Sequence, residues 1–175
     1  MKECERRLAD LPVPTPLSIE ALVKNIQLTR GRQITLTPFD DSEGRLGEAC
    51  GLRLKTPGET IILYRWRPTR TQRDHIILHE LAHEWLDHGT SLTAEEIELY
   101  VPERIREDVL RQHPSAFVQG RVNYDSPEEK EAELSASLIK SQARRQQYSG
   151  DDMVSLLEAS LSHPVAPPSR NSRGR

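Results

Sequence analysis

The stretch HIILHELAHEWLDHG, residues 75–89, places four histidines and three acidic residues among side chains that are suited to a protein core. Its apolar residues would cover most of the circumference of a helix, which is typical of a buried helix; they are Ile76, Ile77, Leu78, Leu81, Ala82, Trp85 and Leu86. We expect this helix to begin near Thr71, which stands three residues before Asp74 as in a capping box, and to end before Gly89. It would be the central helix of the fold.

His79, Glu80 and His83 form the pattern H-E-x-x-H on this helix. Two histidines four residues apart share one helix face, so both can bind one tetrahedral metal ion, normally zinc. Glu80 is offset from that face, where it can take a proton from a water that the metal activates and pass it to a leaving amine. The pattern predicts peptide-bond hydrolysis by zinc with Glu80 as general base. The alternative is a core helix whose histidines bond to backbone carbonyls.

A catalytic zinc needs a third protein ligand, and the segment EEKEAELSA, residues 128–136, offers candidates. Glu129 and Glu133 share a helix face with a stripe of small residues that would let this helix pack closely on the metal-binding helix; the stripe is Ala132, Ala136 and Ala143. We expect Glu129 to be the third ligand and Glu133 to accept a hydrogen bond from a ligand histidine. Ser126 and Glu129 also match a capping box, and if Glu129 only caps its helix, Glu133 becomes the ligand.

The remaining polar residues of the histidine-rich stretch are not expected to bind the metal. His88 is five residues after His83, about 140° further round an ideal helix, so it should point away from the metal as a surface residue. His75 could approach the metal, but three histidines along one helix face do not converge well on one ion. We expect His75, Glu84, Asp87 and His88 to form the exposed edge of the helix.

The elements around these motifs predict an α+β fold. Periodicity, caps and turn residues indicate helices over 19–28, 127–148 and 151–161, and two more within 91–113 that are separated by a break before Pro102. They also indicate strands over 33–39, 49–55 and 60–66. Ser18 is the expected N-cap of the first helix, and Gly31 its stop signal. The strands should form a small antiparallel sheet packed on a mostly helical, zincin-like domain that holds the H-E-x-x-H helix.

Composition sets the expected domain limits and compartment. Residues 1–16, charged and then proline-rich, predict an extended lead-in, residues 17–161 a single metallopeptidase-like domain, and residues 162–175 a disordered tail. The net charge of −3 gives no general attraction to nucleic acid, so direct nucleic-acid binding is not expected. No apolar run long enough to cross a membrane and no apolar N-terminal segment exist, and Cys4 and Cys50 are too few for a disulfide framework, which together predict a cytoplasmic protein.

Two further groups of residues have weaker functional interpretations. A transition-state oxyanion needs a hydrogen-bond donor opposite the metal, and Tyr100, His113, Arg121 and Tyr124 lie between the two motif helices in the sequence. Each of them also fits an ordinary surface or packing role. The basic run RWRPTRTQR, residues 65–73, is typical of a solvated loop, and its functional interpretation is contact with DNA or an acidic partner.

The two motifs resemble those of the ImmA/IrrE family of metallopeptidases. HELAHEWLDH, residues 79–88, is similar to the family's HELGHLLLH, and EKEAELSASL, residues 129–138, is similar to its second motif, E-x-x-A-N-x-F-A-A. Glu129, Ala132 and Ala136 match that motif, whereas Glu133 and Ser135 replace the usual Asn and Phe. The second motif is also similar to the zinc domain of ArdC-type antirestriction proteins. The likeness covers roughly residues 20–145.

The resemblance implies a site, an activity and a partner. His79, His83 and Glu129 would bind zinc, and Glu80 would be catalytic. Such proteins cleave or inactivate a helix-turn-helix repressor, often in response to DNA damage or mobile-element induction, so a narrow zinc endopeptidase acting on a transcriptional regulator is expected. The alternatives are a non-catalytic zinc-containing module that binds a repressor or a toxin-like partner, and binding of single-stranded DNA in the manner of the ArdC proteins, which would depend strongly on salt.

Overall fold

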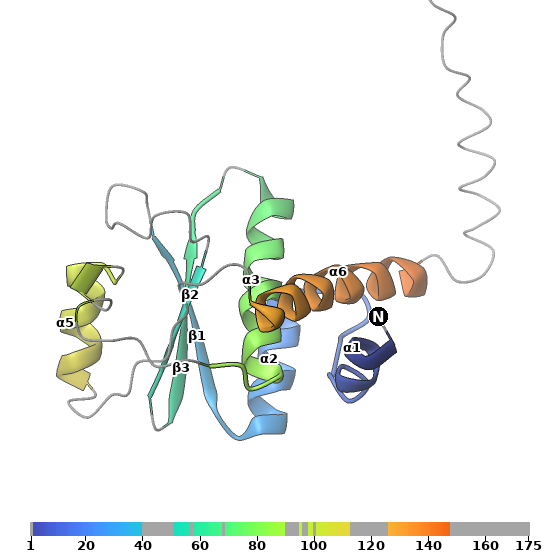
Figure 1. Ribbon diagram of the computed structural model, residues 1–175, viewed down its shortest axis with the longest axis horizontal. Coiled ribbons are helices and arrows are strands. Elements are labelled where there is room, and N and C mark those ends of the chain that lie inside the picture. The colour runs from blue at the N-terminus through green and yellow to red at the C-terminus, as the bar shows by residue number, and fades with distance from the viewer. Residues whose placement is uncertain are drawn as a thin grey trace, which may run out of the picture.

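The computed structural model describes residues 2–39, 51–56, 58–67, 69–89, 95, 98–99, 101–112 and 126–147 of the 175-residue chain. Helices surround one three-stranded sheet, which confirms the α+β class (Figure 1). The histidine-rich helix, α3, lies against the sheet and forms the middle of the fold, as the sequence predicts.

The sheet is mixed, so the expected antiparallel arrangement is wrong for one of its two strand pairs. Its strands are β1 (Gln33–Phe39), β2 (Gly51–Lys55) and β3 (Glu59–Arg65), in the order β1-β3-β2. β2 and β3 form an antiparallel hairpin, in which Leu52 pairs with Leu63. β3 then lies between β2 and β1 and runs parallel to β1, with Leu36 opposite Ile62. With these strand directions, an entirely antiparallel sheet would have β2 in the centre. Instead β3, which is longer and more apolar than β2, takes that place.

Caps define the helix ends close to the expected positions. α2 spans Ile19–Arg30, and the Ser18 hydroxyl accepts a hydrogen bond from the Ala21 amide at 3.2 Å. Gly31 ends α2 in the left-handed conformation, with φ 62°, where glycine has no steric penalty. α3 spans Arg70–Trp85, and its N-cap is Thr69 rather than Thr71.

The C-terminal motif helix also agrees with the sequence prediction. α6 spans Pro127–Gln147, and Ser126 caps it by accepting a hydrogen bond from the Glu129 amide at 3.2 Å. α6 crosses α3, and its small residues Ala132 and Ala136 are fully buried, as a close helix contact requires (Figure 1).

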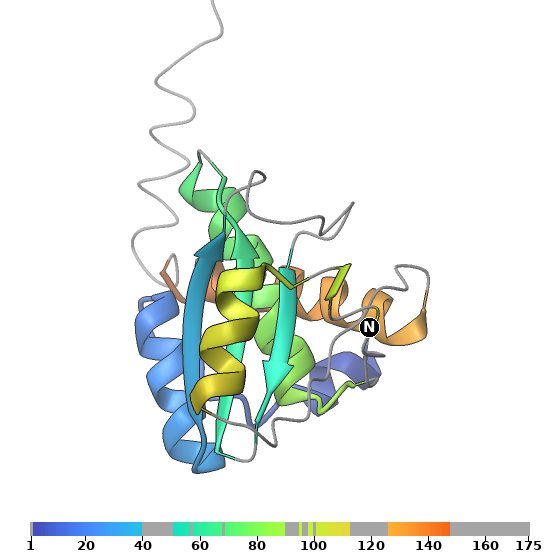
Figure 2. The same ribbon diagram turned by 90° about the vertical axis from the view of Figure 1, so that its left-hand side faces the viewer.

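The elements form layers on the two faces of the sheet. α2 and α3 cover one face, and α5 (Glu103–Gln112) lies over the other (Figures 1 and 2). The main core lies between the sheet, α2, α3 and α6; its least exposed members include Leu22, Ile26, Ile62, Leu78, Leu81 and Ile139. Burial of these large apolar side chains stabilises the central position of α3.

The N-terminal segment is not the extended lead-in that the sequence predicts. Residues Lys2–Arg7 form a helix, α1, and Cys4, Leu8 and Leu11 are buried in the core. Glu3 and Glu5 lie in the first turn of α1, and Arg6 and Arg7 lie in its last turn, which favours a helix. Cys4 and Leu8 are four residues apart and share the buried face. The Cys4 thiol contacts the Ser135 hydroxyl of α6 at 3.1 Å, so α1 packs against α6.

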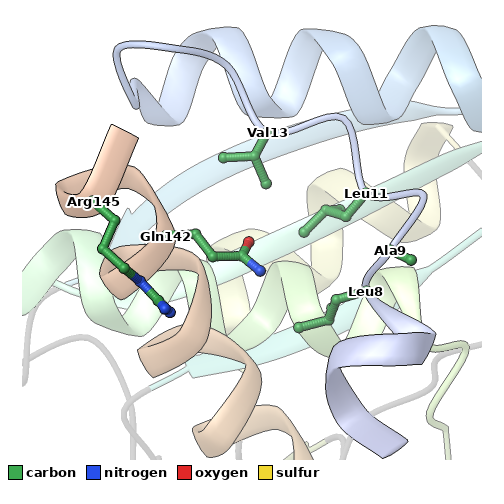
Figure 3. Close-up of a pocket in the computed structure, with 6 residues that line it drawn as sticks. All are labelled: Leu8, Ala9, Leu11, Val13, Gln142 and Arg145. Atoms are coloured by element: carbon green, nitrogen blue, oxygen red, sulfur yellow. The ribbon is translucent and has the colours of Figure 1, made fainter. Parts of the chain in front are cut away.

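An open hollow separates the rest of the N-terminal segment from the C-terminal half of α6. Leu8, Ala9, Leu11 and Val13 form one side, and Gln142 and Arg145 of α6 the other (Figure 3). Its volume is about 370 Å³.

Several sequence predictions fall outside the described residues. These are the helix over 151–161, the tail over 162–175, and most of the first of the two helices expected within 91–113, of which the structure describes residues 95 and 98–99 as helical. Among the helices that the structure describes, none has the length and apolar character needed to cross a lipid bilayer.

Candidate metal centre

Three side chains converge where α3 crosses the first turn of α6. The Nε2 atoms of His79 and His83 are 3.0 Å apart. Glu129 places Oε2 3.1 Å from the Nε2 of His79 and Oε1 3.2 Å from that of His83. Two imidazole nitrogens and a carboxylate therefore face one another from two helices.

This cluster has the donor set and spacing of a metal site. Tetrahedral zinc with ligand bonds of about 2.0–2.2 Å holds its ligand atoms about 3.3–3.6 Å apart, a few tenths of an ångström more than the observed 3.0–3.2 Å. His79, His83 and Glu129 could thus hold a metal ion. Lone pairs brought so close repel one another unless a cation, either a proton or a metal, lies between them.

The electrostatics of the cluster favour a positive charge at its centre. Burial raises the pKa of Glu129, but hydrogen bonds and charge from His79 and His83 outweigh it and hold the pKa far below its ordinary value. Burial lowers the pKa of His79, yet the Glu129 hydrogen bond and the charges of Glu80, Glu129 and Glu133 raise it above its ordinary value. The ionised carboxylate that favours a proton here would equally favour a metal cation.

The structure also bears on the two glutamates that the sequence left open. Glu129 approaches both histidines, whereas Glu133 bonds to His75, with its carboxylate oxygens 3.0 and 3.1 Å from the His75 Nε2. Glu133 Oε2 lies 3.6 Å from the Nδ1 of His79, on the far side of that ring from the cluster. The Ser126 cap uses the backbone amide of Glu129 and so does not compete for its carboxylate.

Glu80 lies on the sheet-facing side of α3, beside β2. It is buried, and a Cβ atom added to Gly51 would lie 2.5 Å from its Oε1. The missing side chain at Gly51 therefore provides the space that the Glu80 carboxylate fills. The sequence singled out Glu80, but it carried no sign that this glycine shapes the position of its carboxylate.

The expected exposed edge of α3 is wrong for Glu84, which is buried against the sheet. Thr60 of β3 donates a hydrogen bond to its Oε1 at 3.1 Å, and Arg53 and Arg32 lie 3.3 and 3.7 Å from its carboxylate oxygens. Glu84 is one turn after Glu80 and shares its face, so this network anchors the same side of the helix to the sheet. The four-residue spacing of Glu80 and Glu84 was the signal that could have predicted that both face the same side of α3.

The expected surface position of His88 is also wrong, because His88 is buried beside the His79–His83–Glu129 cluster. Its Nδ1 lies 3.1 Å from the Nδ1 of His83, and its Nε2 lies 3.0 Å from Oε2 of Glu131. Burial and the nearby His83 lower the pKa of His88, which favours a neutral ring. The prediction extended an ideal helix to residue 88, whereas α3 ends at Trp85. Asp87, in contrast, is exposed as expected, and His75 is only partly exposed.

The other side of the cluster opens into a hollow of about 530 Å³. Its lining residues are His79, Glu129, Lys130, Glu133, Leu134 and Ser137. The four suggested oxyanion donors, Tyr100, His113, Arg121 and Tyr124, lie outside the described residues. Within the basic run, the Arg73 guanidinium lies 4.4 Å from the ring centre of Trp66, so the two side chains stack on each other.

Comparisons of the chain with protein-family models, curated proteins and solved structures gave no match.

Proposed function

We propose that this protein is a zinc-dependent endopeptidase of narrow specificity. The observation that carries the proposal is the convergence of His79, His83 and Glu129 at ligand spacing, with Glu80 next to His79 on the same helix. Two nitrogens and one carboxylate are a ligand set of zinc peptidases, which keep a fourth position open. The hollow beside His79 and Glu129 supports the proposal, because a substrate could approach the cluster through it.

The proposed mechanism assigns zinc binding and proton transfer to different residues. His79, His83 and Glu129 would hold zinc, which when bound supplies a Lewis acid that makes water nucleophilic near neutral pH and polarises a carbonyl. Glu80 would take the proton of the attacking water and give it to the leaving amine. Gly51 leaves space for the Glu80 carboxylate, so its position is set by β2 as well as by α3.

The proposed substrate is a helix-turn-helix regulator, and this part rests on the likeness of the two motifs to those of the ImmA/IrrE family. β2 supports binding of an extended peptide, because it lies at an edge of the described sheet and beside Glu80. A peptide segment that pairs with this edge would present its backbone to the site.

Zinc content and cleavage test the proposal together. We expect about one zinc ion per chain in the purified protein by elemental analysis, in line with a single three-ligand site. Glu80→Gln should keep the zinc and lower cleavage of a helix-turn-helix regulator encoded beside the gene by roughly 10²- to 10⁴-fold, the usual contribution of a general base. Failure of the wild type to take up zinc when it is supplied would overturn the proposal.

Cleavage of the partner by the wild type, and its loss in Glu80→Gln, separates a peptidase from a non-catalytic binding module. In a binding module, Glu80→Gln would leave both zinc and partner binding unchanged, and the wild type would not cut the partner. Binding to single-stranded DNA that weakens steeply with salt would instead support the nucleic-acid alternative.

A further inference from the structure

The outer ring nitrogen of His83 begins a continuous chain of side chains that leaves the metal cluster and reaches the N-terminal helix. We propose that His88, Glu131 and Arg7 are positioning residues that hold His83 in its metal-binding orientation, so that α1 forms part of the metal centre. This inference rests on the proposed zinc site. It concerns how tightly the site holds zinc, which can be measured apart from any cleavage.

The end of α3 places His88 against His83. The amide of Asp87 donates to the carbonyl of Glu84 at 3.4 Å, and the amide of His88 donates to that of His83 at 3.0 Å. Asp87 has the left-handed φ of 54°. These features define a Schellman motif, in which the second residue after the cap folds back over the last turn. His88 occupies that position, and its ring meets the ring of His83 edge to face, with centroids 5.2 Å apart.

One assignment of hydrogens satisfies the chain from the metal cluster outward. Nε2 of His83 faces the cluster, so a neutral His83 carries its hydrogen on Nδ1 and donates it to Nδ1 of His88. The His88 hydrogen is then on Nε2, which donates to Glu131. A carboxylate at the end of such a chain fixes the tautomer and the ring orientation of a metal-binding histidine.

Arg7 connects the carboxylate end of the chain to two other elements. Its guanidinium pairs with the carboxylate of Glu131 and donates to the Leu86 carbonyl, at the end of α3, at 3.1 Å. In return, the Trp85 indole donates to the Arg7 carbonyl at 3.3 Å. Arg7 thus joins α1, α3 and α6 at one point and restricts Glu131 to the orientation that His88 needs.

Zinc affinity of the full-length protein tests the chain, measured by competition with a chromogenic chelator. We expect His88→Ala and Glu131→Ala to weaken zinc binding by roughly 10- to 100-fold, the usual effect of outer-shell partners. Arg7→Ala should weaken it by a smaller factor, and Arg7→Lys should restore part of the loss. Combining Arg7→Ala with Glu131→Ala should add little to Glu131→Ala alone, because both act through one carboxylate.

Arg6→Ala is the matched control, because Arg6 is on the same helix and pairs with Glu3 at the surface. It should leave zinc affinity unchanged. Thermal melting of the metal-free variants measures a general loss of stability separately from zinc affinity. Such a loss lowers the melting temperature without changing the zinc affinity of the folded protein. The partly exposed Arg7 keeps the test informative if His88→Ala does not fold.

The outcomes distinguish this inference from the proposed function. Wild type without zinc affinity overturns both. Wild type that binds zinc, with unchanged affinity in the Arg7, His88 and Glu131 variants, overturns the chain and leaves the metal site. Equal losses in Arg6→Ala and Arg7→Ala would also overturn it.

Discussion

The two histidines of the His79–His83–Glu129 cluster are one helical turn apart, and they differ in how far their surroundings bury them. The His83 side chain is 7% exposed and is backed by the buried His88 and the partly buried Glu131. The His79 side chain is 20% exposed, and among the described residues the acidic partner of its outer nitrogen is Glu133, which is 57% exposed and 3.6 Å away. The cluster thus has a closed side, which holds a ligand in place, and an open side, which faces the hollow. The proposed peptidase would need both, because a rigid site must still admit its substrate.

The largest expected effect comes from Glu129, which serves both sides. Glu129→Ala removes one of the three proposed ligands, so zinc affinity should fall by more than the roughly 10- to 100-fold typical of outer-shell changes. Chelator competition on the purified variant measures it, with circular dichroism to verify the fold. Zinc affinity within a few-fold of wild type would mean that Glu129 is not a zinc ligand.

Gly51→Ala tests whether cleavage can be lost while zinc affinity is kept. The new Cβ would displace the Glu80 carboxylate, so we expect cleavage to fall by roughly 10- to 100-fold, as misplacement of a catalytic group by about 1 Å can cause, while zinc affinity stays the same. Gly58→Ala is the control, since nothing lies within 4 Å of its added Cβ. Equal cleavage by both variants would show that the position of Glu80 does not depend on Gly51.

Glu133→Ala tests the open side directly. Because Glu133 is exposed and lies beyond hydrogen-bond distance from His79, its loss should weaken zinc binding by less than about 10-fold, the lower end of the outer-shell range. Glu131→Ala, on the closed side, should have the larger effect in the same titration. A reversed order would remove the distinction between the two sides, and loss of zinc from Glu133→Ala alone would make Glu133 the ligand.

The smallest effect is expected at Asp87, whose left-handed conformation turns His88 toward the closed side. Asp87→Gly should raise the free energy of unfolding of the metal-free protein relative to Asp87→Val, by about 1–2 kcal/mol, because a β-branched residue is strained at this φ. Both variants lose the bond from Lys55 to Asp87, 2.6 Å long, so their difference isolates the backbone term. Urea unfolding measures it, and equal stability would contradict the Schellman geometry.

Local signals were enough to predict the parts of the fold that depend on local chemistry. The spacing of His79 and His83, the caps at Ser18 and Ser126, and the strand over 33–39 follow from neighbours a few residues apart. The small residues Ala132 and Ala136 indicated the close contact of α6 with α3. These features were enough to predict that His79, His83 and Glu129 lie close together.

What the sequence could not provide depends on contacts distant along the chain. β3 pairs with both other strands, and the parallel pairing with β1 is set by which strand takes the centre of the sheet. Glu84 is buried because Arg53 and Thr60 of the sheet meet it there. His88 was misplaced because helix geometry was continued through Asp87, where the chain in fact turns left-handed.

The contact between Arg7 and Glu131 has a consequence for how the molecule assembles. These residues are separated by 124 positions, whereas His88 and Glu131 are separated by 43 and His79 and Glu129 by 50. Contacts of long sequence separation tend to form late, because closing the long intervening loop costs conformational entropy before the contact is made. During synthesis α1 must wait for α6, the last helix that the structure describes, before the back of the His79–His83–Glu129 cluster is complete. Tight zinc retention would therefore mark the end of folding.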